Sequence, residues 1–290
     1  MIVVQLETLI DFWIRLKRSS LALLSLIVLL GLFLIAGLAP LISPYPPNDT
    51  DMLHTLEGPN PEHPLGTDGL GRDILSRIFF GARVSLVVGF SAVSLATFLG
   101  TLLGSISGFY GGGLDTAIMR IMDMMFAFPA ILLAMLLMSV FGQGLGTTIL
   151  AIGIVSVPGF SRIVRGSVLS AKEEDYVKAA RALGCGDLRI MFKHILPNIL
   201  APITVNATMS VSTAILYTSA LGFLGLGVKP PQAEWGSMLA KGRTYIFNGP
   251  HVIYFPGLAI FITVLAFNLF GDGLRDALDP RMKPRSMGGR

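Results

Sequence analysis

The chain has 290 residues, of which 52% are hydrophobic and only 14% are charged. An average soluble domain carries about 25% charged residues, so this composition excludes a water-soluble globule and indicates a membrane protein. The net charge of +4 requires no nucleic-acid partner, because lysine and arginine accumulate on the cytoplasmic side of membrane proteins. Cys185 is the only cysteine, which excludes an intrachain disulfide and a multi-thiolate metal site.

Five long runs without a charged residue predict the membrane spans, at 21–39, 84–108, 124–161, 195–228 and 251–271. A helix needs about 20 apolar residues to cross the hydrocarbon layer. The third run has 38 residues and is interrupted by Gly142, Gly144 and Gly146, so we expect a hairpin of two spans there. The fourth run supplies one span. The sequence therefore predicts an all-α polytopic membrane protein with six transmembrane helices.

The first span follows Arg15, Lys17 and Arg18, a basic cluster that is also typical of a signal peptide. Its apolar run of 19 residues exceeds the usual length of about 7 to 15, and the GLAP that ends it offers no convincing cleavage site. We therefore expect a retained membrane anchor.

The segment 40–83 is the largest predicted piece outside the membrane on its face. Prolines crowd its first half and exclude a helix there. Its second half, GRDILSRIFFGARVSL, predicts a short interfacial helix that turns Ile74, Leu75, Ile78 and Phe79 toward lipid or protein. The span that follows carries glycines every four residues at 100, 104 and 108, a spacing that lets helices pack closely in lipid.

The distribution of basic residues predicts the orientation. With the N-terminus inside, sixteen of the 22 lysine and arginine residues fall in cytoplasmic segments, seven of them between 162 and 193. Cytoplasmic loops hold the excess of lysine and arginine. We therefore expect both termini and the charged segment around 170–197 to face the cytoplasm.

No residue pattern in the chain supplies a reactive centre. The motifs H-E-x-x-H and G-x-S-x-G are absent, and the spans hold no cluster of histidines or carboxylates, which argues against an intramembrane enzyme. The stretch GFLGLGVK at 222–229 lacks the lysine that a phosphate-binding loop needs directly after its second glycine. A proton-driven carrier would need carboxylates deeper in the membrane. If this protein moves a solute uphill, its ATP site lies on another chain.

Ionisable residues within a span are candidates for function. Here only Arg120 and Asp123 qualify, three residues apart at the cytoplasmic end of the third span, with Asp115 just before them. The alternative interpretation is an i,i+3 ion pair or an anchor at the membrane interface.

The stretch DYVKAARALGCGDLRIMFKHILPN, residues 175–198, is charged and patterned as a helical hairpin. Ser170 and Glu173 match a capping box that predicts the start of the first helix. The first helix presents a low-profile face, made of Ala179, Ala180, Ala182 and Leu183.

The sequence GCG at 184–186 ends the first helix, and Asp187 can cap the second. Pro197 ends the second helix, whose apolar residues recur at amphipathic spacing, at Leu188, Met191, Phe192, Ile195 and Leu196. The hairpin either lies on its own bundle or on lipid headgroups, or it docks in a groove of a cytosolic partner.

Four blocks of sequence carry a family resemblance. Lys178, Ala179 and Ala180, with the later Gly184 and the pair LP at 196–197, resemble the EAA loop of binding-protein-dependent ABC importer permeases. Lys178 stands where the pattern has glutamate, and isoleucine is replaced by histidine at 194. The blocks 63–86, 220–239 and 268–281 are similar to the C-type subunits of dipeptide, oligopeptide and nickel importers.

The resemblance implies a type I importer permease in a bacterial inner membrane, divided into 1–83 with the first span, a five-span core at 84–273 and a tail at 274–290. It implies a homologous second permease, two cytosolic ATPases that hold ATP and magnesium, an external solute-binding protein, and no cofactor or enzymatic activity on this chain. The cargo it implies is a di- or oligopeptide, with nickel, glutathione or another peptide-like solute as alternatives. A stand-alone secondary carrier is a more distant alternative.

The resemblance also assigns a coupling role to the hairpin at about 170–197. The residues it implies for contact with the ATPase are Tyr176, Lys178, Ala179, Ala180, Leu183, Gly184, Asp187, His194, Leu196 and Pro197.

Overall fold

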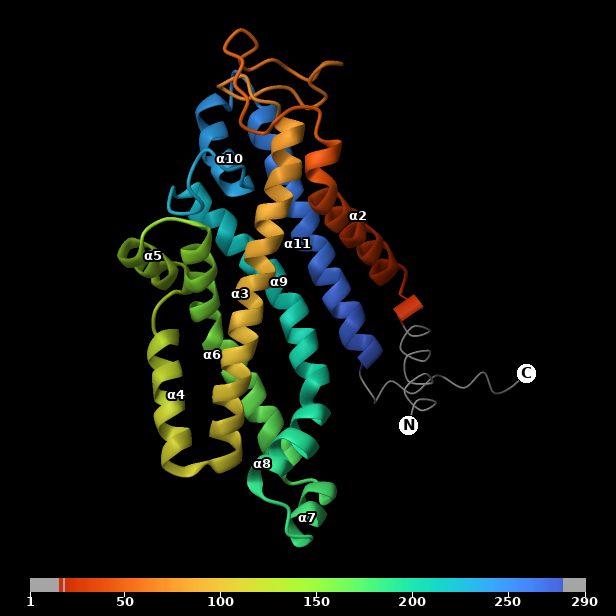
Figure 1. Ribbon diagram of the computed structural model, residues 1–290, viewed down its shortest axis with the longest axis vertical. Helices are drawn as coiled ribbons and strands as arrows, with labels where there is room; N and C mark the ends of the chain where they lie inside the picture. The colour runs from red at the N-terminus through yellow and green to blue at the C-terminus, as the bar shows by residue number, and fades with distance from the viewer. Residues whose placement is uncertain (1–15, 18, 279–290) are drawn as a thin grey trace, which may run out of the picture.

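The computed structural model describes residues 16–17 and 19–278 as a bundle of helices with one end extended into a hairpin (Figure 1). In this range the only β-structure is one isolated bridge, between Thr67 and Asp73. The α-helices are α2 (Ser20–Ile42), α3 (Ile74–Tyr110), α4 (Gly112–Phe126), α5 (Ala130–Phe141), α6 (Leu145–Lys172), α7 (Asp175–Ala182), α8 (Asp187–Arg189), α9 (Leu200–Phe223), α10 (Trp235–Gly242) and α11 (His251–Leu278). A π-helical turn (Ile190–Ile195) and a 3-10 turn (Leu196–Ile199) connect α8 to α9, and a second 3-10 turn (Arg243–Tyr245) follows α10.

The structure contains five to six candidate membrane spans, in agreement with the predicted six when one bent pair of helices counts as a single span. Five helices are long and apolar enough to cross a membrane: α2, α3, α6, α11 and the continuous run Asp187–Phe223. A sixth is reached when the pair α4 and α5, which is bent by 91°, is counted as one span. The predicted turn at 142–146 is confirmed, since α5 ends at Phe141 and α6 begins at Leu145, but the first arm of this hairpin differs: it starts at Gly112 and breaks before Pro129. Proline lacks the N–H that a helix needs and disfavours helix at the residue before it.

Helix α3 is a single element of 37 residues, about 55 Å long at 1.5 Å per residue. The Asp73 carboxylate begins it by accepting a hydrogen bond from the Ser76 backbone N–H at 2.7 Å. The expected short interfacial helix is therefore only the first part of α3, and Ile74 is fully buried in protein rather than turned to lipid. No breaker separates this segment from the span that follows, so the helix continues.

Helix α2 extends past Pro40, where the sequence predicted the start of a non-helical segment. It begins with Ser19, whose Oγ accepts a hydrogen bond from the Ala22 N–H at 3.3 Å, and it passes through Pro40 to Ile42. The segment expected to be non-helical thus starts at Ser43, whose N–H still bonds the Ala39 carbonyl at 3.1 Å. One proline in the last turn removes a single backbone hydrogen bond.

Helices α3 and α6 cross the bundle side by side and approach backbone to backbone (Figure 1). A Cβ atom placed on Gly104 would lie 2.8 Å from the Cβ of Val164, and one on Gly108 would lie 2.9 Å from the Arg165 carbonyl oxygen. Only glycine permits this separation, so the predicted small-residue face of the second span is confirmed. Helices α9 and α11 complete the core, and α2 lies against α3 and α11.

Candidate functional site

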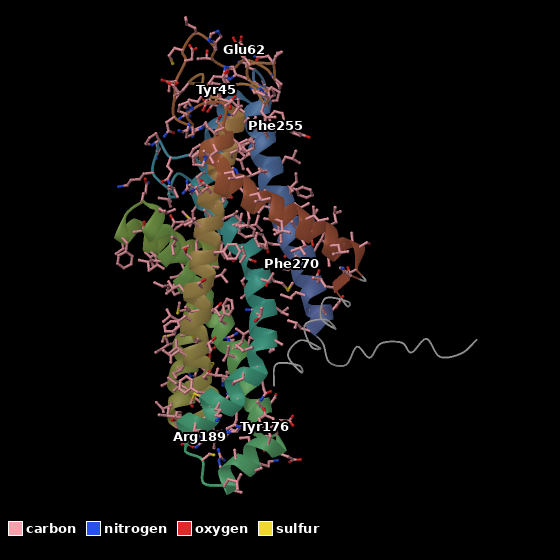
Figure 2. All side chains as sticks on the ribbon, turned by 45° about the vertical axis from the view of Figure 1, so that its right-hand side comes forward. Tyr45, Glu62, Tyr176, Arg189, Phe255 and Phe270 are labelled. Carbon is pink, nitrogen blue, oxygen red and sulfur yellow. The ribbon has the colours of Figure 1, made fainter. Side chains whose placement is uncertain are left out.

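The predicted hairpin projects beyond the ends of the spanning helices (Figure 1). Figure 2 shows Tyr176 and Arg189 at this tip, at the opposite end of the molecule from Tyr45 and Glu62. Residues 173–197, which include α7 and α8, therefore form a protrusion, which we call the coupling hairpin after the role that the resemblance implies.

A small core of its own fixes the coupling hairpin to the bundle. Val177, Ala180, Ile190, Met191 and Ile195 are buried, and they form one cluster with the buried ends of α3 and α6, at Phe109, Val164 and Val168. The Lys172 ammonium adds a hydrogen bond of 2.8 Å to the Phe109 carbonyl. The hairpin is thus packed directly against α3 and α6.

The opposite side of the hairpin is apolar and uncovered. Leu183 is 83% exposed, Leu188 is 65% exposed and Phe192 is 61% exposed. The side chains of Lys178, Arg181, Arg189 and Lys193 are exposed around them. The predicted amphipathic stripe is therefore split: Met191 and Ile195 are buried, whereas Leu188 and Phe192 are exposed, because π-helical geometry rotates successive residues differently from an α-helix.

The turn between the two helices depends on one glycine. Gly184 has φ +81°, a left-handed conformation that side-chain-bearing residues rarely adopt. Its N–H bonds the Arg181 carbonyl at 3.0 Å, and the next N–H, of Cys185, bonds the Ala180 carbonyl at 3.1 Å. These bonds close the end of α7, so the predicted helix stop at 184–186 is confirmed.

Two predicted helix caps are wrong. Ser170 lies inside α6 and donates its hydroxyl to the Gly166 carbonyl at 3.2 Å, so α6 continues to Lys172 and α7 begins only at Asp175. Asp187 is the first residue of α8, and its side chain makes no capping hydrogen bond there. Tertiary packing of α6 against α3 extends that helix past the local capping signal.

Pro197 does not end the second helix as predicted. The chain passes it in a 3-10 turn and continues into α9, after a π-helical turn that shifts the backbone hydrogen-bond register. This shift accommodates a residue without an N–H. The other predicted coupling residues also lie in the hairpin and differ in exposure. Tyr176, Ala179 and Asp187 are exposed, whereas His194 and Leu196 are half-buried.

A polar groove lies between α4 and α6 on the same half of the molecule. Arg165 donates two hydrogen bonds of 2.6 Å to the carboxylate of Asp115, which also accepts one from Ser107. Arg162 pairs with Asp123 at 2.5 Å. The expected i,i+3 pair between Arg120 and Asp123 is thus replaced, in the part of the chain that the structure describes, by a pair between two helices.

The end of the molecule opposite the hairpin holds a buried ionic network that sequence reasoning missed. The Asp68 carboxylate accepts hydrogen bonds from Arg72 Nε at 2.8 Å and Nη2 at 2.5 Å, and Arg77 Nε lies 3.8 Å from it. Arg77 also donates to the Pro47 carbonyl at 2.6 Å. The three charged residues are at most 8% exposed. Asp68 and Arg72 are four residues apart but lie outside any helix, so only the fold brings the three together.

Glu234, in the segment between α9 and α11, is fully buried. Its two carboxylate oxygens accept hydrogen bonds of 2.7 Å from the N–H groups of Gly236 and Ser237, which begin α10. Burial raises the pKa of Glu234 to about 7, although these two hydrogen bonds act in the opposite direction. A carboxylate directly before the apolar start of a helix was the signal that could have identified this cap.

This raised pKa predicts a stability that falls with pH. Between the ordinary value of 4.5 and about 7, the folded protein retains a proton that the unfolded chain releases, so the free energy of unfolding decreases as the pH rises through this window. The contribution amounts to a few kcal/mol, since one pKa unit corresponds to about 1.4 kcal/mol. The measurement is the unfolding free energy of the protein and of Glu234→Gln from pH 4.5 to 8. The difference between the two should change with pH in this window; a constant difference would contradict the prediction.

Two family models match the chain. The model described as "Binding-protein-dependent transport system inner membrane component" matches residues 100–284, which include α6, the coupling hairpin and α9. The chain belongs to this permease family. A second model, "N-terminal TM domain of oligopeptide transport permease C", matches residues 8–59. The permease is therefore a multi-pass inner membrane protein of the ABC importer class, and members of this class work with an ATPase and a solute-binding protein.

Relatives match along nearly the whole chain. The dipeptide transport system permease protein DppC of Alkalihalophilus pseudofirmus is 50% identical over 269 residues, which are 93% of this permease and 88% of the relative. The glutathione transport system permease protein GsiD of Pectobacterium atrosepticum is 46% identical over 276 residues, 94% of this permease and 91% of the relative. These two names differ in cargo but share the permease role.

A solved structure confirms the fold. The permease is similar to a chain of the MetNI methionine ABC transporter in an inward-facing conformation, with a TM-score of 0.59 and 20% sequence identity, over 71% of the permease and 98% of that chain. The predicted type I importer permease fold is therefore confirmed.

Proposed function

We propose that this permease forms half of the translocation path of a di- or oligopeptide importer, and that the coupling hairpin receives the work of ATP hydrolysis. The other half of the path is a homologous second permease. Two cytosolic ATPases hold ATP and magnesium, and an external binding protein delivers the solute. The division into 1–83, the core at 84–273 and the tail at 274–290 remains a prediction, and residues 279–290 lie outside the described part of the chain.

The observation that carries the proposal is the two-sided coupling hairpin. One side is buried against α3 and α6 through Val177, Ile190 and Ile195. The other side exposes large apolar side chains amid four cations at the tip. An exposed apolar set framed by charge is typical of a helix that docks in a partner's groove. Force applied to Leu183 or Leu188 would reach the spanning helices through the buried side.

The orientation follows from charge. Sixteen of the 22 lysine and arginine residues, including those of the coupling hairpin, fall on one side of the predicted spans. The positive-inside rule puts this side in the cytoplasm, and with it both termini. The hairpin would then meet the ATPases, and the buried Asp68 network would face the binding protein.

The cargo proposed is a peptide. Relatives named as dipeptide and di/tripeptide permeases are 47–50% identical to this permease, and one named as a glutathione permease is 46% identical. Glutathione is itself peptide-like, so these names point to one chemical class of solute. Nickel remains an alternative cargo, and a stand-alone secondary carrier is a more distant alternative.

A reconstitution separates these alternatives. We expect a tagged permease, purified in mild detergent from its native membrane, to retain the second permease and two ATPases. Proteoliposomes of this complex should import alanylalanine only when ATP and the binding protein are both present. Uptake of the dipeptide by the isolated permease along an ion gradient, without nucleotide, would overturn the proposal in favour of the secondary carrier.

A further inference from the structure

The polar groove between α4 and α6 has a volume of about 490 Å³, and its walls carry two carboxylates and three guanidinium groups. Of the 15 residues of α4, only Met122 is buried. Charged side chains at membrane depth line water-filled cavities or the bundle interior. The charged side of α4 is therefore expected to border an aqueous space.

The ion pairs of the groove differ in burial and in the number of their hydrogen bonds. Arg165 and Asp115 make a partly buried, two-hydrogen-bond pair that ties α6 to α4. Arg162 and Asp123 make a single contact, and their side chains are 49% and 52% exposed; such exposed pairs are weak and open easily.

Arg120 completes the groove. Within 16–17 and 19–278, no carboxylate lies at ion-pair distance from its side chain. The groove thus contains one guanidinium group without an ion-pair partner among the described residues, that of Arg120. Beside it lies the carboxylate of Asp123, whose exposed pair with Arg162 can open.

Arg120 and Asp123 are three residues apart on α4 and both line the groove, which allows them to reach the two ends of a small zwitterion. Side chains three residues apart on a helix have Cβ atoms about 5–6 Å apart. In an extended dipeptide, whose residues span about 3.3–3.6 Å each, the terminal ammonium and carboxylate are separated by a similar distance. Guanidinium groups bind carboxylates in a planar, two-hydrogen-bond geometry.

We propose that Arg120 binds the terminal carboxylate of the transported peptide and that Asp123 binds its terminal ammonium, in the cytoplasmic half of the path. This inference rests on the proposed function and names the chemistry of its cargo. A lipid phosphate is the competing ligand. It would use only the arginines and would be repelled by Asp115 and Asp123, whereas a zwitterion uses both signs of charge.

The test compares alanylalanine with its C-terminal amide on the complete transporter. Binding is measured by equilibrium dialysis in nanodiscs without binding protein. ATP-driven uptake is measured in proteoliposomes with binding protein. Loss of one charge-assisted contact corresponds to about a tenfold change in affinity. We expect Arg120→Gln to weaken binding of alanylalanine about tenfold and leave the amide unchanged, and Arg120→Lys to restore part of the preference. Asp123→Asn should act likewise on alanylalanine against its N-acetyl derivative. The matched control is Arg83→Gln, an exposed arginine near the outer end of α3.

The outcomes are separable. Equal weakening of the free peptide and the amide by Arg120→Gln would overturn the site. An effect that appears only in nanodiscs containing phosphatidylglycerol, and equally for both probes, would assign Arg120 to lipid headgroups instead. Failure of the unaltered complex to import with ATP would overturn the proposed function, while the dialysis measurement would still decide the site.

Discussion

Replacing Gly184 with valine is expected to abolish ATP-driven uptake while the permease still inserts into the membrane. At φ +81°, a β-branched residue is a steric outlier, and the strain costs roughly 1–3 kcal/mol. The chain relieves this strain by opening the turn, which displaces Leu183 and Leu188 relative to each other. We expect uptake to fall more than tenfold, because the exposed apolar set no longer matches its groove.

The chain provides a matched control two residues further on. Gly186 has φ −69° and ψ 156°, a β conformation that valine favours, and no atom lies within 4 Å of the position of an added Cβ. Gly186→Val should therefore retain uptake. The measurements are membrane content by immunoblot, co-purification of the ATPases, and uptake of alanylalanine by the reconstituted complex. Normal uptake by Gly184→Val would contradict a coupling role for this turn.

Replacing Asp68 with asparagine is expected to produce the largest loss of stability. Asp68 is the carboxylate that neutralises Arg72 and Arg77, which are 4% and 1% exposed. Removing one partner of a buried ion pair leaves an uncompensated charge and costs about 3–5 kcal/mol. Asparagine also turns an N–H₂ group toward one of the guanidinium groups. We expect the free energy of unfolding to fall by about 3 kcal/mol, measured by denaturant titration in micelles.

Asp51→Asn is the control for the Asp68 variant. Asp51 lies in the same outer segment and pairs with His54 at 2.7 Å, but the two side chains are 51% and 45% exposed. Water solvates both groups when the pair is removed, so no measurable change is expected. If Asp68→Asn unfolds at the same denaturant concentration as this control, the buried network does not hold the outer end together.

Local signals were sufficient for the spans and the hairpin. Uncharged runs of about 20 residues leave a chain few options other than crossing the membrane, and the fold contains the six predicted spans. The GCG stretch at 184–186 stopped α7 as expected, because a left-handed glycine is a property of the backbone itself. The glycines at 104 and 108 likewise packed against α6.

Predictions that depended on a distant partner were less successful. Ser170 matched a capping box, yet α6 runs through it, because packing against α3 stabilises the longer helix. Asp123 stood one turn from Arg120, yet it pairs with Arg162, 39 residues away. An intrahelical pair contributes only about 0.2–0.5 kcal/mol, so a better-placed cation on a neighbouring helix takes the carboxylate.

The amino-acid sequence alone determined the membrane class of this permease, the apolar runs that form its spans, its family and the place of its coupling hairpin, since hydropathy, glycine and motif spacing act over a few neighbouring residues. Tertiary structure alone decided which half of the hairpin is exposed, which arginine pairs with which aspartate, and that Asp68 and Glu234 are buried. These properties depend on what lies opposite each side chain in space, and no spacing along the chain contains that information.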